Sequence, residues 1–213
     1  MIEALGVPHT EVELILINGK SSGFGQRLQD GDHVAVYPVF GAFDIALLRR
    51  LHPPPPPTRF VADAHLGALA RLLRMAGFDT LYRNDYEDRE IAEIAGRENR
   101  IVLTRDRDLL KHRVITYGCY IHALKPPQQF HEVSLRLDLA PQQQPFTRCM
   151  LCNLPLRPVA RDQILASLPA SVRSNPSYVK FTTCDHCGRI YWKGSHWQRM
   201  AARFDHPAPP QEG

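Results

Sequence analysis

The sequence predicts an α/β fold: a mostly parallel sheet flanked by helices, between a short strand-rich segment and a cysteine-bearing segment. Within 60–140, short apolar runs alternate with helical patterns, and this alternation implies parallel strands joined by right-handed crossovers. Five consecutive prolines at 53–57 precede that region, and two Cys-x-x-Cys pairs follow it. These three observations divide the chain into distinct parts.

Composition narrows the class of protein. The 213 residues are 44% apolar and 23% charged, as in ordinary globular chains. The net charge of +4 permits a nucleic-acid partner. No apolar run reaches the length of a membrane span, and the N-terminus lacks the pattern of a signal peptide. Four of the five cysteines form Cys-x-x-Cys pairs, which favours a reducing compartment, so we expect a cytoplasmic protein without a membrane partner.

Residues 1–46 contain two strand candidates, Val12–Ile17 and Val34–Val39, and the dipeptide Asn18-Gly19 is a hairpin signal. The pattern resembles the C-terminal half of a β-grasp, the ubiquitin-like fold of the sulfur carriers. The first hairpin of a complete β-grasp is missing and the chain runs on after Gly41, so a docking module is favoured over a carrier. Half a β-grasp leaves an open strand edge. We expect the segment to be poorly ordered or to pair with a protein partner or a second copy of this chain.

The segment 47–59 is interpreted as a linker. It holds the prolines at 53–57, and consecutive prolines adopt extended polyproline II and act as a semi-rigid spacer. A domain boundary is therefore expected here.

The region 60–140 supplies the elements of the parallel sheet. Apolar residues from Leu66 to Ala76 recur at spacings of three and four, which predicts an amphipathic helix that ends at Gly77. Asp88 is expected to cap a second helix, which ends at Asn99. The expected strands are 60–62, 80–82, 101–103 and 119–124.

Two aspartates follow strands of this sheet. Asp63 comes directly after the first strand, and Asp106 lies just past the third. The carboxyl ends of parallel strands meet at one edge, where ligands bind in open α/β sheets, so the two side chains are expected to converge. Hard cations such as Mg²⁺ take carboxylate oxygens as ligands, and Asp108 follows closely. The structural alternative is that Asp106 or Asp108 caps a helix after the strand.

A longer set of residues carries a family resemblance. It comprises Asp63, Leu66-Gly67, Leu69-Ala70-Arg71, Leu73-Arg74, Gly77-Phe78-Asp79-Thr80-Leu81-Tyr82, Asp88 and Leu103-Thr104-Arg105-Asp106. In these residues 60–139 resembles the PIN-like Mut-seven C-terminal (Mut-C) RNase domain. The resemblance continues through both Cys-x-x-Cys pairs and the segment Tyr191–Trp197, and a β-grasp segment also precedes this domain in bacterial relatives.

The segment 141–204 is expected to be a zinc ribbon. Its two pairs, Cys149/Cys152 and Cys184/Cys187, supply the four thiolates of a tetrahedral structural Zn²⁺ site, and the long spacer should carry a helix at 161–168. Two disulfides or unrelated thiols are the alternatives. Cys119 is interpreted as a buried apolar residue. The Pro-rich tail 205–213 is expected to be disordered.

Aromatic and basic residues near the end of the ribbon predict contact with RNA. Tyr191, Trp192 and Trp197 lie among cations such as Lys193, and such a mixture stacks on unpaired bases while holding phosphates. Ordinary packing of these rings against a small ribbon is the alternative.

The resemblance implies a metal-dependent ribonuclease. Its Mg²⁺ or Mn²⁺ would be held by Asp63 and Asp106, with Asp88 and Asp108 as further catalytic carboxylates and Asp85 and Glu90 as weaker candidates. The zinc ribbon would aid RNA binding, and a non-catalytic RNA-binding adaptor is the competing hypothesis. The expected RNA contacts are Arg71, Arg74, Arg105, Arg107, Lys193 and Trp197.

Overall fold

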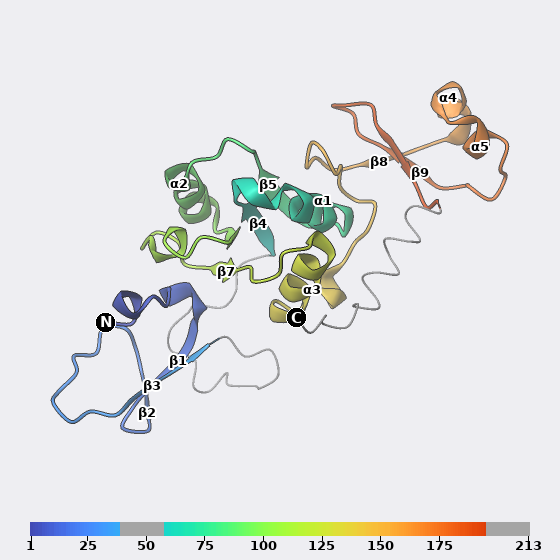
Figure 1. The fold of residues 1–213 in the computed structure, drawn as a ribbon. Helices are drawn as coiled ribbons and strands as arrows, with labels where there is room; N and C mark the ends of the chain where they lie inside the picture. The colour runs from blue at the N-terminus through green and yellow to red at the C-terminus, as the bar shows by residue number, and fades with distance from the viewer. Residues whose placement is uncertain (39–57, 195–213) are drawn as a thin grey trace.

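The computed structural model describes residues 1–38 and 58–194 (Figure 1). An N-terminal sheet lies at one end, an α/β domain in the centre, and a small segment with strands and short helices at the other end. Trp197, the tail 205–213 and most of the linker 47–59 lie outside the described residues. The domain limits expected from the sequence stay predictions.

The N-terminal segment is an antiparallel sheet of order β2-β1-β3. Its elements are η1 (Glu3–Leu5), η2 (His9–Glu11), β1 (Val12–Ile17), β2 (Lys20–Ser22) and β3 (Val34–Pro38). Asn18 and Gly19 have φ angles of 50° and 77°, which two-residue hairpin turns of this kind require. The expected hairpin and strands are therefore present. Poor order, one of the two expected states, is not what the structure shows for 1–38.

The α/β domain contains a parallel four-stranded sheet of order β5-β4-β6-β7. Its strands are β4 (Arg59–Ala62), β5 (Asp79–Tyr82), β6 (Ile101–Thr104) and β7 (Gly118–Tyr120). The fourth strand is shorter than expected. Its ladder ends because the Glu132 carboxylate accepts the backbone N–H groups of His122 and Ala123.

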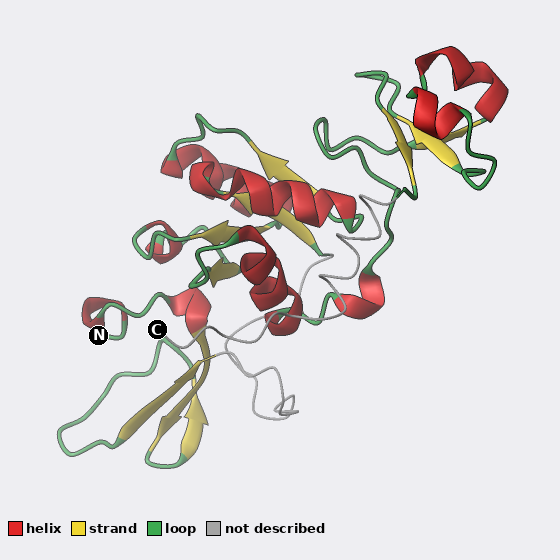
Figure 2. Cartoon of the chain, turned by 45° about the vertical axis from the view of Figure 1, so that its right-hand side comes forward, coloured by secondary structure: helices red, strands yellow, loops and turns green. Residues whose placement is uncertain are grey.

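Helices cover both faces of this sheet (Figure 2). They are η3 (Ala64–Leu66), α1 (Gly67–Met75), α2 (Asp88–Glu98), η4 (Leu109–Lys111) and α3 (Pro126–Arg136). Phe60 and Ala62 pack toward α1 and α3, whereas Val61 between them packs toward α2 and η4. Burial on both faces explains why β4 reads as a short apolar run without alternation.

Two local features differ from the sequence-based expectation. The cap of α2 is Glu87, which forms a capping box with Glu90, and Asp88 is the first helical residue. The helix α3 was not predicted. Its signal was present, because Pro126 stands in its first turn, where proline is favoured, and Phe130 and Val133 lie three apart on its buried face.

The C-terminal segment is a second antiparallel sheet with a small core of its own. Its elements are η5 (Ala140–Gln142), β8 (Arg157–Val159), α4 (Arg161–Ile164), η6 (Leu165–Ser167), α5 (Ala170–Arg173), β9 (Phe181–Thr183) and β10 (Ile190–Trp192). The helix expected at 161–168 is α4 continuing into η6. Ile164, Leu168, Val172 and Phe181 form the core. None of the helices in the described ranges is long and apolar enough to cross a lipid bilayer.

Candidate functional site

The four cysteines of the two pairs lie in two turns with the same backbone geometry. The N–H of Cys149 donates to the carbonyl five residues later, and the N–H of Asn153 donates back to Cys149. In the second turn, the N–H of Cys184 likewise donates to the carbonyl of Arg189, and the N–H of Gly188 donates to the carbonyl of Cys184. Asn153 and Gly188 both have positive φ, 61° and 67°, which Asn and Gly tolerate best. Local sequence therefore shapes each turn so that its two thiols point the same way.

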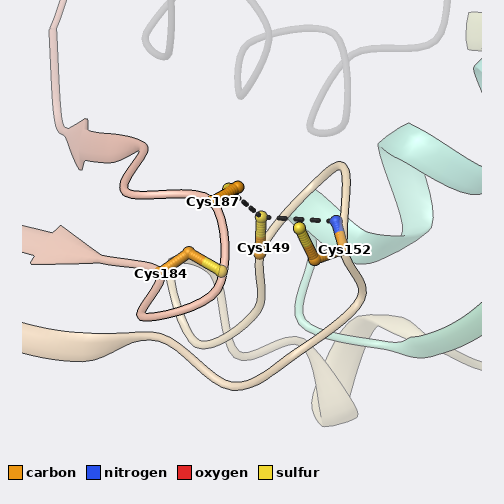
Figure 3. A group of neighbouring side chains, drawn as sticks. All are labelled: Cys149, Cys152, Cys184 and Cys187. Atoms are coloured by element: carbon orange, nitrogen blue, oxygen red, sulfur yellow. Dashed lines mark hydrogen bonds between the residues drawn. The ribbon is translucent and has the colours of Figure 1, made fainter.

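The two turns bring all four sulfur atoms within 4.8 Å of one another, and Figure 3 shows the side chains converging. The Sγ atoms of Cys149 and Cys187 are 3.7 Å apart. A tetrahedron with Zn–S bonds of about 2.3 Å has edges of about 3.8 Å. Burial raises the pKa of Cys149, but hydrogen bonds from the backbone and from the Tyr191 hydroxyl outweigh burial and lower it to about 6. The donor set fits Zn²⁺.

The first cysteine turn is bound to the edge of the α/β domain. Asn153 accepts the N–H of Thr80 at 3.0 Å and donates to Asp79 at 2.7 Å. Arg100 holds the same carboxylate from the other side, at 2.9 Å. Burial raises the pKa of Asp79, but the hydrogen bonds from Arg100 and Asn153 outweigh it and hold the pKa below its usual range. The first cysteine turn and strand β5 thus share one polar network.

Arg74 lies in this contact between the α/β domain and the first cysteine turn, and not on an RNA surface. Its side chain is buried, and its guanidinium donates to the carbonyls of Thr80, Met150 and Leu151. The expectation that Arg74 contacts phosphate is therefore corrected, because these carbonyls occupy its donors inside the protein. Arg74 fastens α1 and β5 to the cysteine turn.

The second candidate site lies where β4 and β6 end. Asp63 follows β4, and its carboxylate accepts from the backbone of Ala64 at 2.5 Å and from the Thr104 hydroxyl at 2.7 Å. The same hydroxyl accepts the N–H of Asp106 at 2.9 Å. Thr104 thus connects the two acids through one oxygen. Asp63 is buried, with 9% exposure, and Asp106 is exposed.

Asp88, at the start of α2, faces the same two acids. Burial raises the pKa of Asp88, and the charges of Asp106 and Asp63 raise it further. His112 opposes this shift. Three carboxylates from three elements therefore lie within electrostatic reach of one another. Among the described residues, however, only the cysteines are close enough to form a ready-made ion site.

The other acidic candidates have local partners. Asp108 bonds to Lys111 at 2.7 Å, and this bond lowers its pKa. Asp85 forms two bonds with Arg83, at 2.9 and 2.7 Å, and Glu90 accepts the N–H of Glu87 in the capping box. The bonds of these three carboxylates are to local partners and not to the three acids at the strand ends.

The Mut7-C RNAse domain family matches residues 58–204, and the Mut7-C ubiquitin family matches 1–44. The chain belongs to the Mut7-C RNAse domain family. A human protein named exonuclease mut-7 homolog is 24% identical over 225 aligned residues, which cover 68% of this chain and 25% of that protein. The chain therefore spans about a quarter of this relative's length. No solved structure matches the chain.

Four of the cations that were expected to contact RNA are exposed. Arg71 on α1 and Arg105 and Arg107 after β6 are exposed, and the Arg107 guanidinium lies 4.9 Å from the centroid of the Tyr120 ring. Lys193 is exposed in the C-terminal segment. Trp197 lies outside the described residues. The positions of Arg71, Arg105, Arg107 and Lys193 are compatible with contact to a polyanion.

Sequence reasoning missed the residues that join the N-terminal segment to the Mut7-C domain. Glu11 accepts the N–H of Tyr120 at 2.8 Å and an Arg136 donor at 2.7 Å. His9 bonds to the carbonyl of Ile115 at 2.8 Å. Isolated polar residues in a short segment carry no pattern that reveals such contacts. Cys119, next to Tyr120, is buried as expected, and burial raises its pKa to about 12.

Proposed function

We propose that the chain is a metal-dependent ribonuclease that hydrolyses RNA phosphodiester bonds at the carboxylate edge. The observation that carries the proposal is the gathering of Asp63, Asp88 and Asp106 at one edge of the sheet. Thr104 bonds both to the Asp63 carboxylate and to the Asp106 backbone, and the charges of these two acids add to the burial that raises the pKa of Asp88. Like charges that are gathered in this way favour a cation between them. Membership of an RNase domain family supports RNA as the substrate.

The donor set suits a hard cation. Asp63 and Asp106 would hold Mg²⁺ or Mn²⁺, and Asp88 would be the third ligand. Such ions bind carboxylate oxygens together with oxygens of the substrate. When bound, the cation lowers the pKa of a coordinated water and neutralises charge on the phosphate. We keep Asp108 as a fourth candidate, since an RNA phosphate would compete for Lys111, its partner at 2.7 Å.

The chain's own residues orient these groups. Thr104 holds the Asp63 carboxylate at 2.7 Å and the backbone of Asp106 at 2.9 Å, and the Asp106 carboxylate accepts the N–H of Asp108 at 2.7 Å. Arg105 and Arg107 flank Asp106 and would bind the phosphates on either side of the scissile bond. The cysteine site would hold structural Zn²⁺ and keep the C-terminal segment folded as an RNA-binding part.

A non-catalytic RNA-binding adaptor is the second candidate. The observation that favours it concerns the spacing of Asp63, Asp88 and Asp106. Within the described ranges, these three carboxylates are not among the side chains that lie close enough together to hold an ion. The N-terminal match to the Mut7-C ubiquitin family would then supply partner binding. An adaptor needs no Mn²⁺ at these carboxylates.

The deciding experiment separates the two metals. Purified protein is stripped with a chelator and reconstituted with one equivalent of Zn²⁺, which is expected to refill the cysteines first. Mixed single-stranded RNA is then incubated with this protein alone, with added Mn²⁺ and with added Mg²⁺. Cleavage that requires the second metal supports the proposal. Absence of cleavage under every condition, with RNA still bound, favours the adaptor.

A further inference from the structure

A cavity of about 710 Å³ lies in the C-terminal segment, away from the carboxylate edge. Its volume falls within the usual range of ligand pockets, roughly 300–1,000 Å³. Four aromatic side chains line it: Phe146, Tyr178, Tyr191 and Trp192. Two arginines, Arg148 and Arg189, also line it, and none of the lining residues in the described part of the chain is acidic.

The aromatic walls are held in place before any ligand arrives. The Tyr191 hydroxyl lies 3.1 Å from the Cys149 sulfur, which ties its ring to the first cysteine turn. Trp192 packs against Phe181 with ring centroids 6.4 Å apart. The backbone at Gly194 passes so close that a Cβ there would lie 2.7 Å from the Trp192 indole nitrogen. Fixed rings lose little entropy when a flat ligand stacks on them.

The charges of the cavity select an anionic ligand. Arg189 is exposed, and within the described ranges no acceptor meets its guanidinium. Lys193 stands at the rim, with its Nζ atom 5.9 Å from the centroid of the Phe146 ring. An apolar peptide would desolvate these cations without compensation, whereas a nucleotide offers both a flat base and a phosphate.

We propose that this cavity binds an unstacked base of single-stranded RNA together with its adjoining phosphate. The inference rests on the proposed function and deepens it, because it gives the substrate a second point of attachment. Met75, at the end of α1, borders the cavity, and Asp63 precedes the start of the same helix. Nine residues make a helix roughly 14 Å long, with Arg71 exposed along it. An RNA strand that runs along α1 would reach both the cavity and the carboxylate edge.

The test uses zinc-loaded Asp106→Asn protein, so that binding is measured without cleavage, and oligouridines of about 4 to 16 nucleotides, the usual range of single-strand sites. Phe146→Leu and Arg189→Ala should each weaken affinity for the longer oligomers by about 5- to 150-fold. Phe146→Tyr, which keeps the ring, should retain the affinity. Arg27→Ala removes the same charge from an exposed loop of the N-terminal segment and should leave the affinity unchanged.

A second readout reports on the cavity directly. In a Trp197→Phe background Trp192 is the sole tryptophan, and RNA binding should quench its emission. Zinc content and melting temperature of each variant exclude misfolding as the cause. RNA binding that is insensitive to Phe146→Leu and Arg189→Ala, without quenching, would overturn the proposal and assign the cavity to a protein segment. These binding results stand whether or not the wild-type protein cleaves RNA, so the two proposals fail separately.

Discussion

The cysteine site and the carboxylate edge hold their candidate ligands in opposite ways. The cysteines come from two turns whose geometry is set by hydrogen bonds within six residues, around Cys149 and Cys184. The acids Asp63, Asp88 and Asp106 come from three elements that only the folded sheet brings together. The cysteine sulfurs already lie within 4.8 Å of one another, whereas the charges of Asp63 and Asp106 add to the burial that raises the pKa of Asp88.

The difference teaches what each site does for the fold. A closed four-thiolate site contributes folding free energy when it binds Zn²⁺. At the sheet edge, by contrast, the charge of Asp88 costs stability without a cation, as its raised pKa indicates, a pattern expected where structure serves catalysis. Removing a cysteine should therefore unfold a segment, whereas neutralising the exposed Asp106 should spare the fold and abolish the proposed cleavage.

The largest expected effect comes from Cys184→Ser. Structural zinc sites contribute about 10–16 kcal/mol in small modules, so the variant should lose zinc and the C-terminal segment should unfold. The α/β domain should remain folded but melt at a lower temperature, because Arg74 loses its acceptors in the cysteine turn. Elemental analysis and circular dichroism measure both effects. Cys119→Ala is the control, and it should retain one zinc per chain.

A smaller effect is expected at Glu11, which supports strand β7 beside the carboxylate edge. Glu11→Gln keeps the shape but weakens the bonds to Tyr120 and Arg136, at a cost of about 1–3 kcal/mol for a half-buried charged hydrogen bond. Denaturant unfolding measures this, and zinc content should not change. Glu93→Gln, which removes an exposed partner of Arg89, should cost less than about 0.5 kcal/mol. Equal effects of the two variants would refute a supporting role for Glu11.

The smallest effect is a gain of stability. Because the folded pKa of Asp88 is raised, its charge destabilises the fold above that pKa, and the penalty disappears below the ordinary carboxyl value of about 4. Asp88→Asn should raise the melting temperature of zinc-loaded protein at pH 7 but not near pH 4. Screening at this exposed position limits the gain to about 0.5 kcal/mol. Added Mn²⁺ should stabilise the wild type more than the variant. A lower melting temperature for the variant at pH 7 would contradict this.

Sequence reasoning succeeded where the signal is local. The hairpin at Asn18-Gly19, the buried run Ile101–Leu103 and the cysteine spacing each reflect a constraint within a few residues. Asp63 and Asp106 were expected to converge because parallel strands place their ends at one edge. Thr104 bonds to the Asp63 carboxylate and to the Asp106 backbone, and a metal ion shared by the two carboxylates stays a prediction. The role of Thr104 itself was not anticipated, since a threonine at a strand end is ordinary.

The failures arise where tertiary contacts decide. Arg71 and Arg74 look equivalent as arginines of one helix, yet Arg74 lies four residues after Ala70 and shares its buried face. Its acceptors in the cysteine turn are more than 70 residues away along the chain. The docking of His9 and Glu11 and the bonds of Asn153 to β5 are likewise long-range. Periodicity indicates which side chains are buried, but not which groups form hydrogen bonds with them.

The most direct test of the central claim is Asp106→Asn, with cleavage rate, RNA affinity and melting temperature measured on one zinc-loaded preparation in Mn²⁺. The variant keeps the size of the side chain and removes ligand charge, so cleavage should fall by orders of magnitude. RNA affinity should stay equal or rise, because a negative charge has left a surface that faces phosphates, and the fold should persist. Asp162→Asn, the same change on exposed α4, should alter none of the three quantities. Unchanged cleavage by well-folded Asp106→Asn protein would contradict the assignment of a metal-dependent ribonuclease site at this edge.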